Sequence, residues 1–360
     1  MELVEILQTA LMIILGTIGL AAFGVIFGLL FKGIDRKLAA HMQGRVGPPI
    51  KQPFLDVVKL FTKENIVPEN AIPWVFNLAP LVALSGAISI LLYLPIVPQP
   101  NGGLAPLVGF GGDLILILYL LMIPALGLII GGFASGSPYA TVGAQREMAT
   151  MIAYEFPLAI IAVTVAWRLS LEVNLSNVFS FATISSAAPI WTVVGPLGFI
   201  GFLILLFALI LVTPAELSKI PFDTPEAETE IAEGVMVEYS GRNLGMFYLA
   251  DGVKTVVMAS LIVALFFPFN LSPLFGLNGI IAASVDVLFF LLKVFLVILF
   301  SVTLIRVAVA RLKIDQIVYT YWVPITLIAL VGLIFVMWDT ATLSSTGLGW
   351  PRVIELLGLI

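Results

Sequence analysis

The chain has 360 residues, of which 60% are hydrophobic and 11% charged, and its mean hydropathy is +1.13. These values exclude a soluble domain and indicate a polytopic membrane protein. The absence of cysteine excludes disulfides, Cys-ligated zinc and any iron–sulfur cluster held by this chain alone, and we expect no nucleic-acid partner.

Eight apolar runs are long enough to cross a hydrocarbon core of about 30 Å. They cover Leu3–Phe31, Ile72–Pro95, Leu114–Phe133, Ala149–Trp167, Ile190–Val212, Leu244–Phe267, Ile280–Ile305 and Tyr321–Trp338. The runs are continuous rather than alternating, which disfavours a β-barrel. The first run is expected to remain as a span, because Glu2 and Glu5 replace the basic residues of a signal peptide. We therefore predict an all-α bundle of about eight transmembrane helices in a single domain, residues 1–360.

The distribution of Lys and Arg predicts the orientation of the chain in the cell membrane. Arg168 and Arg352 are assigned to the even-numbered side. The odd-numbered loops and their flanks carry Lys32, Arg36, Lys37, Arg45, Lys51, Lys59, Lys63, Arg146, Lys219, Arg242, Arg306, Arg311 and Lys313. We therefore expect both termini outside, and the loops after spans one, three, five and seven in the cytoplasm.

The first cytoplasmic loop, about residues 32–71, combines an irregular turn with an amphipathic helix. Glycines and prolines at 44–49 force the turn, and from about residue 51 to 64 apolar residues recur at helical spacing. This helix is expected to lie at the membrane surface, either as a lipid anchor or as a docking platform for a soluble partner. The candidate docking residues are Arg45, Gly47, Pro48, Gln52, Asp56, Lys59 and Lys63, together with Arg146 and Arg242 in later loops.

Ionisable residues inside the spans are costly and are candidate functional sites. Glu155 has no basic neighbour in sequence, and Pro157 predicts a broken or kinked helix beside it. Asp251 and Lys254 share one helix face at i, i+3, which fits either a neutral ion pair between them or a proton relay. Asp286 and Lys293 lie two turns apart and are expected to bond to neighbours rather than to each other.

The fifth loop, about residues 214–243, concentrates acidic side chains. They are Glu216, Asp223, Glu226, Glu228, Glu230, Glu233 and Glu238. Asp223 or Thr224 is expected to cap a short helix that begins near Pro225. In such a helix Glu226, Glu230 and Glu233 would share one face, and burial of such a cluster favours proton uptake. A solvated acidic face is the ordinary alternative.

Two of these stretches resemble signatures of a known family. The segment Ala215–Glu228, followed by Glu238–Gly241, resembles the fifth-loop signature of the H subunit of respiratory complex I. The segment Arg45–Glu64 resembles its first-loop signature, and Glu155 matches its intramembrane glutamate. The compact Arg45–Pro53 element and Lys254 are closest to the branch of membrane-bound NiFe hydrogenases, formate hydrogenlyases and archaeal sulfur-reducing complexes.

The resemblance implies a membrane-anchor and coupling subunit of an ion-pumping respiratory oxidoreductase. It implies no cofactor in this chain. Iron–sulfur clusters, and NiFe where present, would belong to docked peripheral subunits, and ferredoxin would donate electrons to the complex. Other membrane subunits, including antiporter-like ones, would move protons or sodium ions. The relay would comprise Glu155, Glu216, Asp223, Glu226, Glu228, Glu230, Glu233, Glu238, Asp251 and Lys254.

Three alternatives remain open at this stage. A quinone-binding member of the same family, from an NADH- or ferredoxin-quinone oxidoreductase, would share the fold, although the shortened first loop argues against a quinone site. A stand-alone secondary ion transporter would also carry intramembrane charges. A purely structural anchor would tolerate neutralisation of the whole acidic loop.

Overall fold

The computed structural model describes residues 2–99, 103–171, 178–186 and 194–346. Arg352 and the expected start of the fifth span at Ile190 lie outside these ranges. Within them, eight helical segments are long and apolar enough to cross a membrane, which confirms the predicted all-α architecture.

The eight spans follow one another along the chain. The helices that form the first four spans are α1 (Glu2–Met42), α3 (Pro73–Leu91), α4 (Asp113–Ala134) and α5 (Pro138–Leu169). The other four are α8 (Pro196–Glu216), α10 (Gly241–Phe266), α11 (Gly279–Ile298) continued by η5 (Leu299–Thr303) and α12 (Leu304–Ala308), and α13 (Ile314–Thr320) continued by η6 (Tyr321–Ile325) and α14 (Thr326–Thr346). The continuations η5 and η6 are single π-helical turns.

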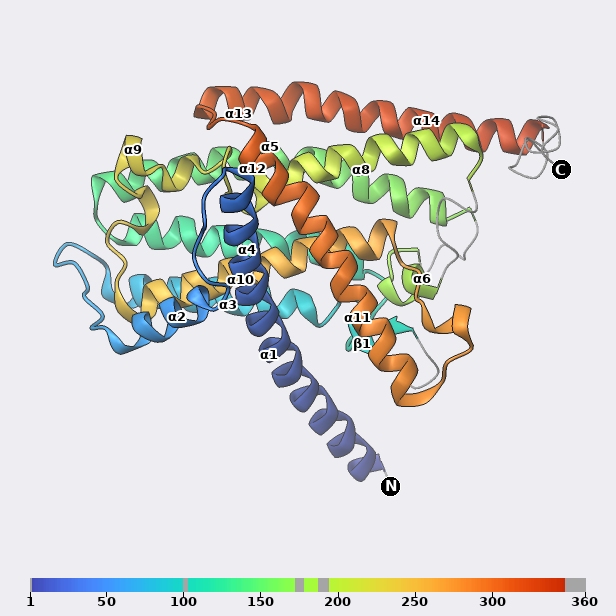
Figure 1. Cartoon of the computed structure of the whole chain (residues 1–360), viewed down its shortest axis with the longest axis horizontal. Helices are drawn as coiled ribbons and strands as arrows, with labels where there is room; N and C mark the ends of the chain where they lie inside the picture. The colour runs from blue at the N-terminus through green and yellow to red at the C-terminus, as the bar shows by residue number, and fades with distance from the viewer. Residues whose placement is uncertain (1, 100–102, 172–177, 187–193, 347–360) are drawn as a thin grey trace.

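Most of these helices run side by side, whereas α1 and α11 run obliquely to them (Figure 1). Helix α10 is the most enclosed, because nearly all residues of its apolar window are buried. Helix α1 approaches α10 closely at Gly28, where an added Cβ would lie 2.5 Å from the carbonyl oxygen of Gly252. Glycine at this crossing therefore allows the two backbones to meet.

Short elements close the two ends of the bundle. The end that we call the polar end carries the surface helix α2 (Gln52–Thr62) and the segment with η2 (Thr224–Glu226), α9 (Glu228–Ile231) and η3 (Gly234–Met236). The opposite end carries β1 (Val97–Pro98) paired antiparallel with β2 (Leu104–Ala105), α6 (Phe181–Ser186) and η4 (Ser272–Phe275). Figure 1 shows these two groups at opposite sides of the molecule.

Two boundaries differ from the sequence prediction. Helix α1 continues to Met42, so Lys32 and Arg36 belong to a helix rather than to the first loop. A span predicted from an apolar run ends at the first charged residue. The helix itself continues, because ion pairs to other helices stabilise its polar turns. Helix α5 runs through Pro157 to Leu169, so of the predicted break or kink the break is wrong. The surface helix predicted at 51–64 is confirmed as α2.

At the opposite end, buried Asp286 of α11 accepts hydrogen bonds from the backbone of Gly103, Leu271 and Ser272 and from the Ser272 hydroxyl. Lys293, two turns further on, donates to the carbonyls of Phe267 and Phe269. The two side chains thus bond to neighbours and not to each other, as expected. Asp286 therefore anchors the loop at Gly103 and the loop at Leu271 and Ser272 to α11.

Candidate functional site

A small cavity inside the polar end gathers ionisable side chains from four elements. Its volume is about 40 Å³, and its polar lining includes Glu147 of α5, Glu216 at the end of α8, Glu226 of η2, and Asp251 and Lys254 of α10. We call it the acidic cavity. A site of this size and polarity can accommodate water, which needs roughly 10–15 Å³.

Glu216 and Lys254 form a buried ion pair in the wall of this cavity. Lys254 Nζ lies 2.9 Å from Glu216 Oε1, and the side chains are only 8% and 2% exposed. The same ammonium donates to the Glu216 carbonyl at 2.6 Å, where a cation also stabilises the C-terminus of α8. The neutral pair between Asp251 and Lys254 that their spacing allowed is therefore wrong, since Lys254 bonds to a partner 38 residues away.

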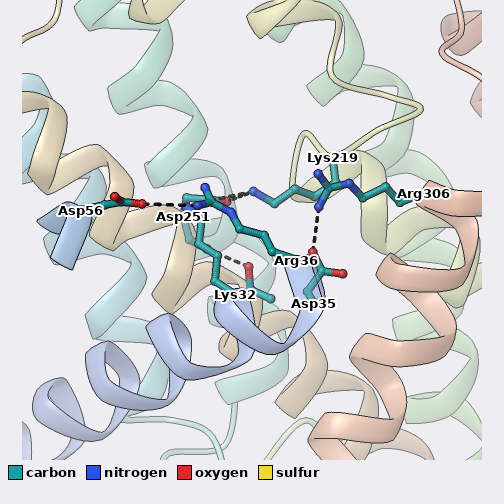
Figure 2. A network of polar contacts seen from close by, with 8 residues as sticks. Lys32, Asp35, Arg36, Asp56, Lys219, Asp251 and Arg306 are labelled. Carbon is teal, nitrogen blue, oxygen red and sulfur yellow. Dashed lines mark hydrogen bonds and ion pairs between the residues drawn. The ribbon is translucent and has the colours of Figure 1, made fainter. Parts of the chain in front are cut away.

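Asp251 is the centre of a second group of charges. It accepts from Lys32 of α1 at 2.6 Å and from Lys219 of the fifth loop at 2.6 and 2.7 Å (Figure 2). The Lys32 ammonium also lies 3.3 Å from the centre of the Tyr248 ring. One carboxylate thus joins α1, α10 and the fifth loop. Two ammonium groups share this single carboxylate, so the group carries an excess positive charge.

Glu226 of the fifth loop interacts electrostatically with both of these lysines. Burial raises the pKa of the Glu226 carboxyl above its ordinary value, while Lys219 opposes the rise and Asp251 adds to it. Glu226 therefore keeps a proton at higher pH than a free glutamate does. It lines the same cavity as Glu216.

Glu155 lies two turns beyond Glu147 on α5 and interacts electrostatically with Glu216 and Lys254. Its Oε1 is buried without a hydrogen-bond partner among the described residues. The hydroxyl of Tyr154 is likewise buried and unpartnered there, and it interacts with all three of Glu147, Glu155 and Glu216. The tyrosine hydroxyl can both donate and accept, so it is suited to bridge Glu155 and the acidic cavity.

The remaining acidic residues of the fifth loop do not form one carboxylate face. The backbone leaves helical geometry at Ala227, and Ala232 and Glu233 have left-handed φ values of 49° and 70°. Asp223 precedes η2 but forms no side-chain cap. Its carboxylate instead accepts a hydrogen bond from Arg311 Nε at 2.9 Å. Glu230 forms an ion pair with Arg146, whereas Glu228 and Glu233 are exposed and Glu238 is half-buried. The predicted single helix is wrong because tertiary partners hold separate turns.

The predicted docking residues divide into two groups. Four basic residues are exposed at the polar end, namely Arg45, Lys59, Lys63 and Arg242. The others have structural roles: Gln52 donates to Asp56 at 2.8 Å, Arg146 holds Glu230, and Pro48 is half-buried. Gly47 has φ +68°, and a Cβ there would lie 2.7 Å from the Ala40 Cβ, so a glycine is required.

Sequence reasoning missed Glu147 and Tyr154 and gave Lys32 no role beyond orientation. Lys32 directly follows one apolar run and Glu147 shortly precedes another, so both resemble ordinary loop charges. The available signal was that helices α1 and α5 extend past the apolar runs and include Lys32 and Glu147. Among the described residues, no group of three His, Cys, Asp or Glu side chains converges to hold a metal ion.

Comparison with known proteins identifies relatives along most of the chain. A family model described as NADH dehydrogenase matches residues 15–337. The H subunit of the NADH-quinone oxidoreductase of Anoxybacillus flavithermus is 34% identical, over 88% of this chain and 91% of its own length. The H subunit of the F420H2 dehydrogenase of Methanosarcina mazei is 31% identical, over 88% and 91%.

A solved structure shares the fold as well. A chain of the membrane-bound sulfane sulfur reductase, an archaeal respiratory membrane complex, superimposes with a TM-score of 0.75 and 28% sequence identity. The match covers 90% of the present chain and 99% of the other. The sequence pattern is therefore shared with H subunits of several complexes, and the arrangement of helices with a chain of the sulfane sulfur reductase.

Proposed function

Since the chain belongs to the NADH dehydrogenase family of complex I H subunits, we propose that it anchors a redox-driven ion pump in the membrane and couples its two reactions. The observation that carries this proposal is the connected set of buried charges around the acidic cavity. They extend from the fifth loop at the surface to Glu155 inside a span. A subunit that only anchored its partners would need no such set, because buried charges are costly.

In the proposed mechanism, a redox change in a docked partner alters the protonation of the fifth loop. Glu228, Glu230, Glu233 and Glu238 lie at its surface, where they can exchange protons with water or the partner. Glu226 would pass the charge change to the cavity, where Asp251 and the Glu216–Lys254 pair respond. Glu155 would carry it into the bundle, and Asp223 would hold the loop through Arg311.

The wider setting is also a proposal. We place the chain in the cell membrane with both termini outside, which puts the polar end in the cytoplasm. Lys59, Lys63 and Arg242 would contact peripheral iron–sulfur and hydrogenase-like subunits, which would receive their electrons from ferredoxin. Antiporter-like subunits would pack in the membrane and move protons or sodium ions, and the redox centres would all belong to partners.

Relatives named for quinone reduction favour a second candidate, in which the chain helps to bind a quinone. The two candidates share the relay and differ in the acceptor. Redox turnover of the complex is measured with a soluble quinone and with protons or polysulfide as the electron acceptor. Turnover with the quinone supports the second candidate, and turnover with protons or polysulfide supports the first. The stand-alone transporter predicts ion transport by the chain alone in liposomes, whereas our proposal predicts none.

The central test compares Glu155→Gln and Glu226→Gln in the intact complex by measuring redox turnover and ion pumping in the same vesicles. We expect both variants to lose most of the ions pumped per electron. Asp315→Asn is the matched control, because Asp315 is an exposed carboxylate of the polar end outside the relay. Unchanged coupling in both glutamine variants would remove the relay from the mechanism.

A further inference from the structure

A second and larger cavity at the polar end contains basic side chains from four segments. Its volume is about 480 Å³, and its charged lining residues are Arg36 of α1, Arg45 of the first loop, Arg306 of α12, and Arg311 in the segment that follows. No Asp or Glu of the described chain lines it. We call it the basic cavity, and we propose that it binds the phosphate headgroup of a membrane phospholipid.

Carboxylates that do not line the cavity orient three of the four arginines. Asp35 holds Arg306 at 2.9 Å and Asp56 holds Arg36 at 3.4 Å (Figure 2). Asp223 holds Arg311, and Asp35 is itself fixed by a hydrogen bond from Thr303. A guanidinium has five N–H donors, so one that binds a carboxylate retains others for a second oxyanion.

The fourth arginine supplies unbalanced charge. None of the ion pairs of the described residues includes Arg45, whose guanidinium donates only to the neutral amide of Gln43. Arginine forks match the oxygens of a phosphate, and phosphate is the anion that membranes present in quantity. The lining therefore offers several positioned donors and no competing carboxylate, as a phosphate group requires.

The depth of the cavity favours a lipid over a soluble anion or an acidic segment of a partner. The apolar run of α1 ends at Phe31, so Arg36 lies about five residues, or roughly 7.5 Å, further along the helix. The apolar run of α11 and its continuation ends at Ile305, directly before Arg306. The headgroup layer extends roughly 5–7.5 Å beyond the hydrocarbon core, so Arg306 lies within it and Arg36 at its outer edge.

Apolar surface for the acyl chains adjoins the arginines. Phe300 and Leu304, within two turns before Arg306, are 54% and 37% exposed. Val309, which lines the cavity, is 42% exposed. Basic residues at the mouth with apolar residues below match the two halves of a phospholipid.

The test counts phospholipid bound to the purified complex after detergent washing, by extraction and mass spectrometry. We expect wild type and Lys313→Gln, an exposed control outside the cavity, to retain the same amount of phospholipid, about one molecule per chain. Each basic residue near the membrane surface contributes about 1 kcal/mol, so Arg45→Gln should lower retention roughly fivefold and Arg36→Gln with Arg45→Gln by more. Arg45 is exposed, so its variant is expected to fold.

The same preparation distinguishes the other occupants. Equal retention in wild type and both variants would overturn the proposal. So would binding of inorganic phosphate without any bound lipid, which would identify a soluble anion. A photocrosslinker at position 45 that captures only protein would identify a partner segment instead. The readout is lipid, so it stands independently of whether the relay couples ion movement.

Discussion

Replacing Lys254 by methionine is expected to destabilise the complex in a strongly pH-dependent way. The substitution keeps much of the side-chain volume but removes the charge that faces Glu216 at 2.9 Å. Both side chains are almost fully enclosed, and removal of one partner of a buried pair typically costs about 3–5 kcal/mol. The carboxylate left behind would have to stay charged without a partner or take up a proton.

Protonation sets a ceiling on this penalty. A free glutamate titrates near 4.3 and each pH unit corresponds to about 1.36 kcal/mol, so neutralising it at pH 7 costs about 3.7 kcal/mol. If the folded variant holds that proton and the unfolded chain does not, the folded state binds one proton more. Its stability relative to wild type should therefore fall by about 1.4 kcal/mol for each unit of rising pH between 5 and 7.

Thermal unfolding of the purified complex between pH 5 and 7 measures this slope. Glu216→Gln with Lys254→Met should recover most of the loss, because two neutral side chains replace the pair. Lys313→Met, at an exposed position outside the acidic cavity and the proposed docking set, is the control and should leave stability unchanged. A Lys254→Met complex as stable as wild type at pH 7, with no pH dependence, would refute the reasoning.

Three further changes test other parts of the structure by the same unfolding measurement. Because its pKa is raised in the folded state, Glu226 contributes stability at low pH that is lost as the pH rises through that folded-state pKa. Glu226→Gln should therefore flatten the dependence of stability on pH above about 4.5. An unchanged pH dependence would contradict this. Gly28→Ala should cost about 1–3 kcal/mol by pushing α1 from Gly252, whereas Gly19→Ala, with nothing within 4 Å, should cost nothing, so equal effects would exclude close packing as the cause. Asp286→Asn should cost at least about 1–3 kcal/mol, because an amide accepts fewer of the hydrogen bonds from the end loops; a neutral result would show that water replaces them.

The acidic fifth loop shows where prediction from sequence stopped. Its concentration of carboxylates and the start of a helical turn near Pro225 were visible in the chain. Helical spacing failed from Ala227 onward, because Arg146 and Arg311 hold different parts of the loop, and the backbone leaves helical geometry at Ala227 and again at Ala232 and Glu233. Local periodicity cannot anticipate a loop whose shape is set by partners 80 or more residues away.

The sequence alone determined the membrane class, the eight spans and the surface helix, because hydrocarbon thickness and helical rise translate directly into apolar length and period. Only the tertiary structure decided which charges meet. Lys254 pairs with Glu216 rather than with Asp251 one turn away, and Asp251 joins Lys32 from the far end of the sequence. Charges buried among several helices take whichever partner the packing brings within about 3 Å, and that choice is not encoded in the spacing along any one helix.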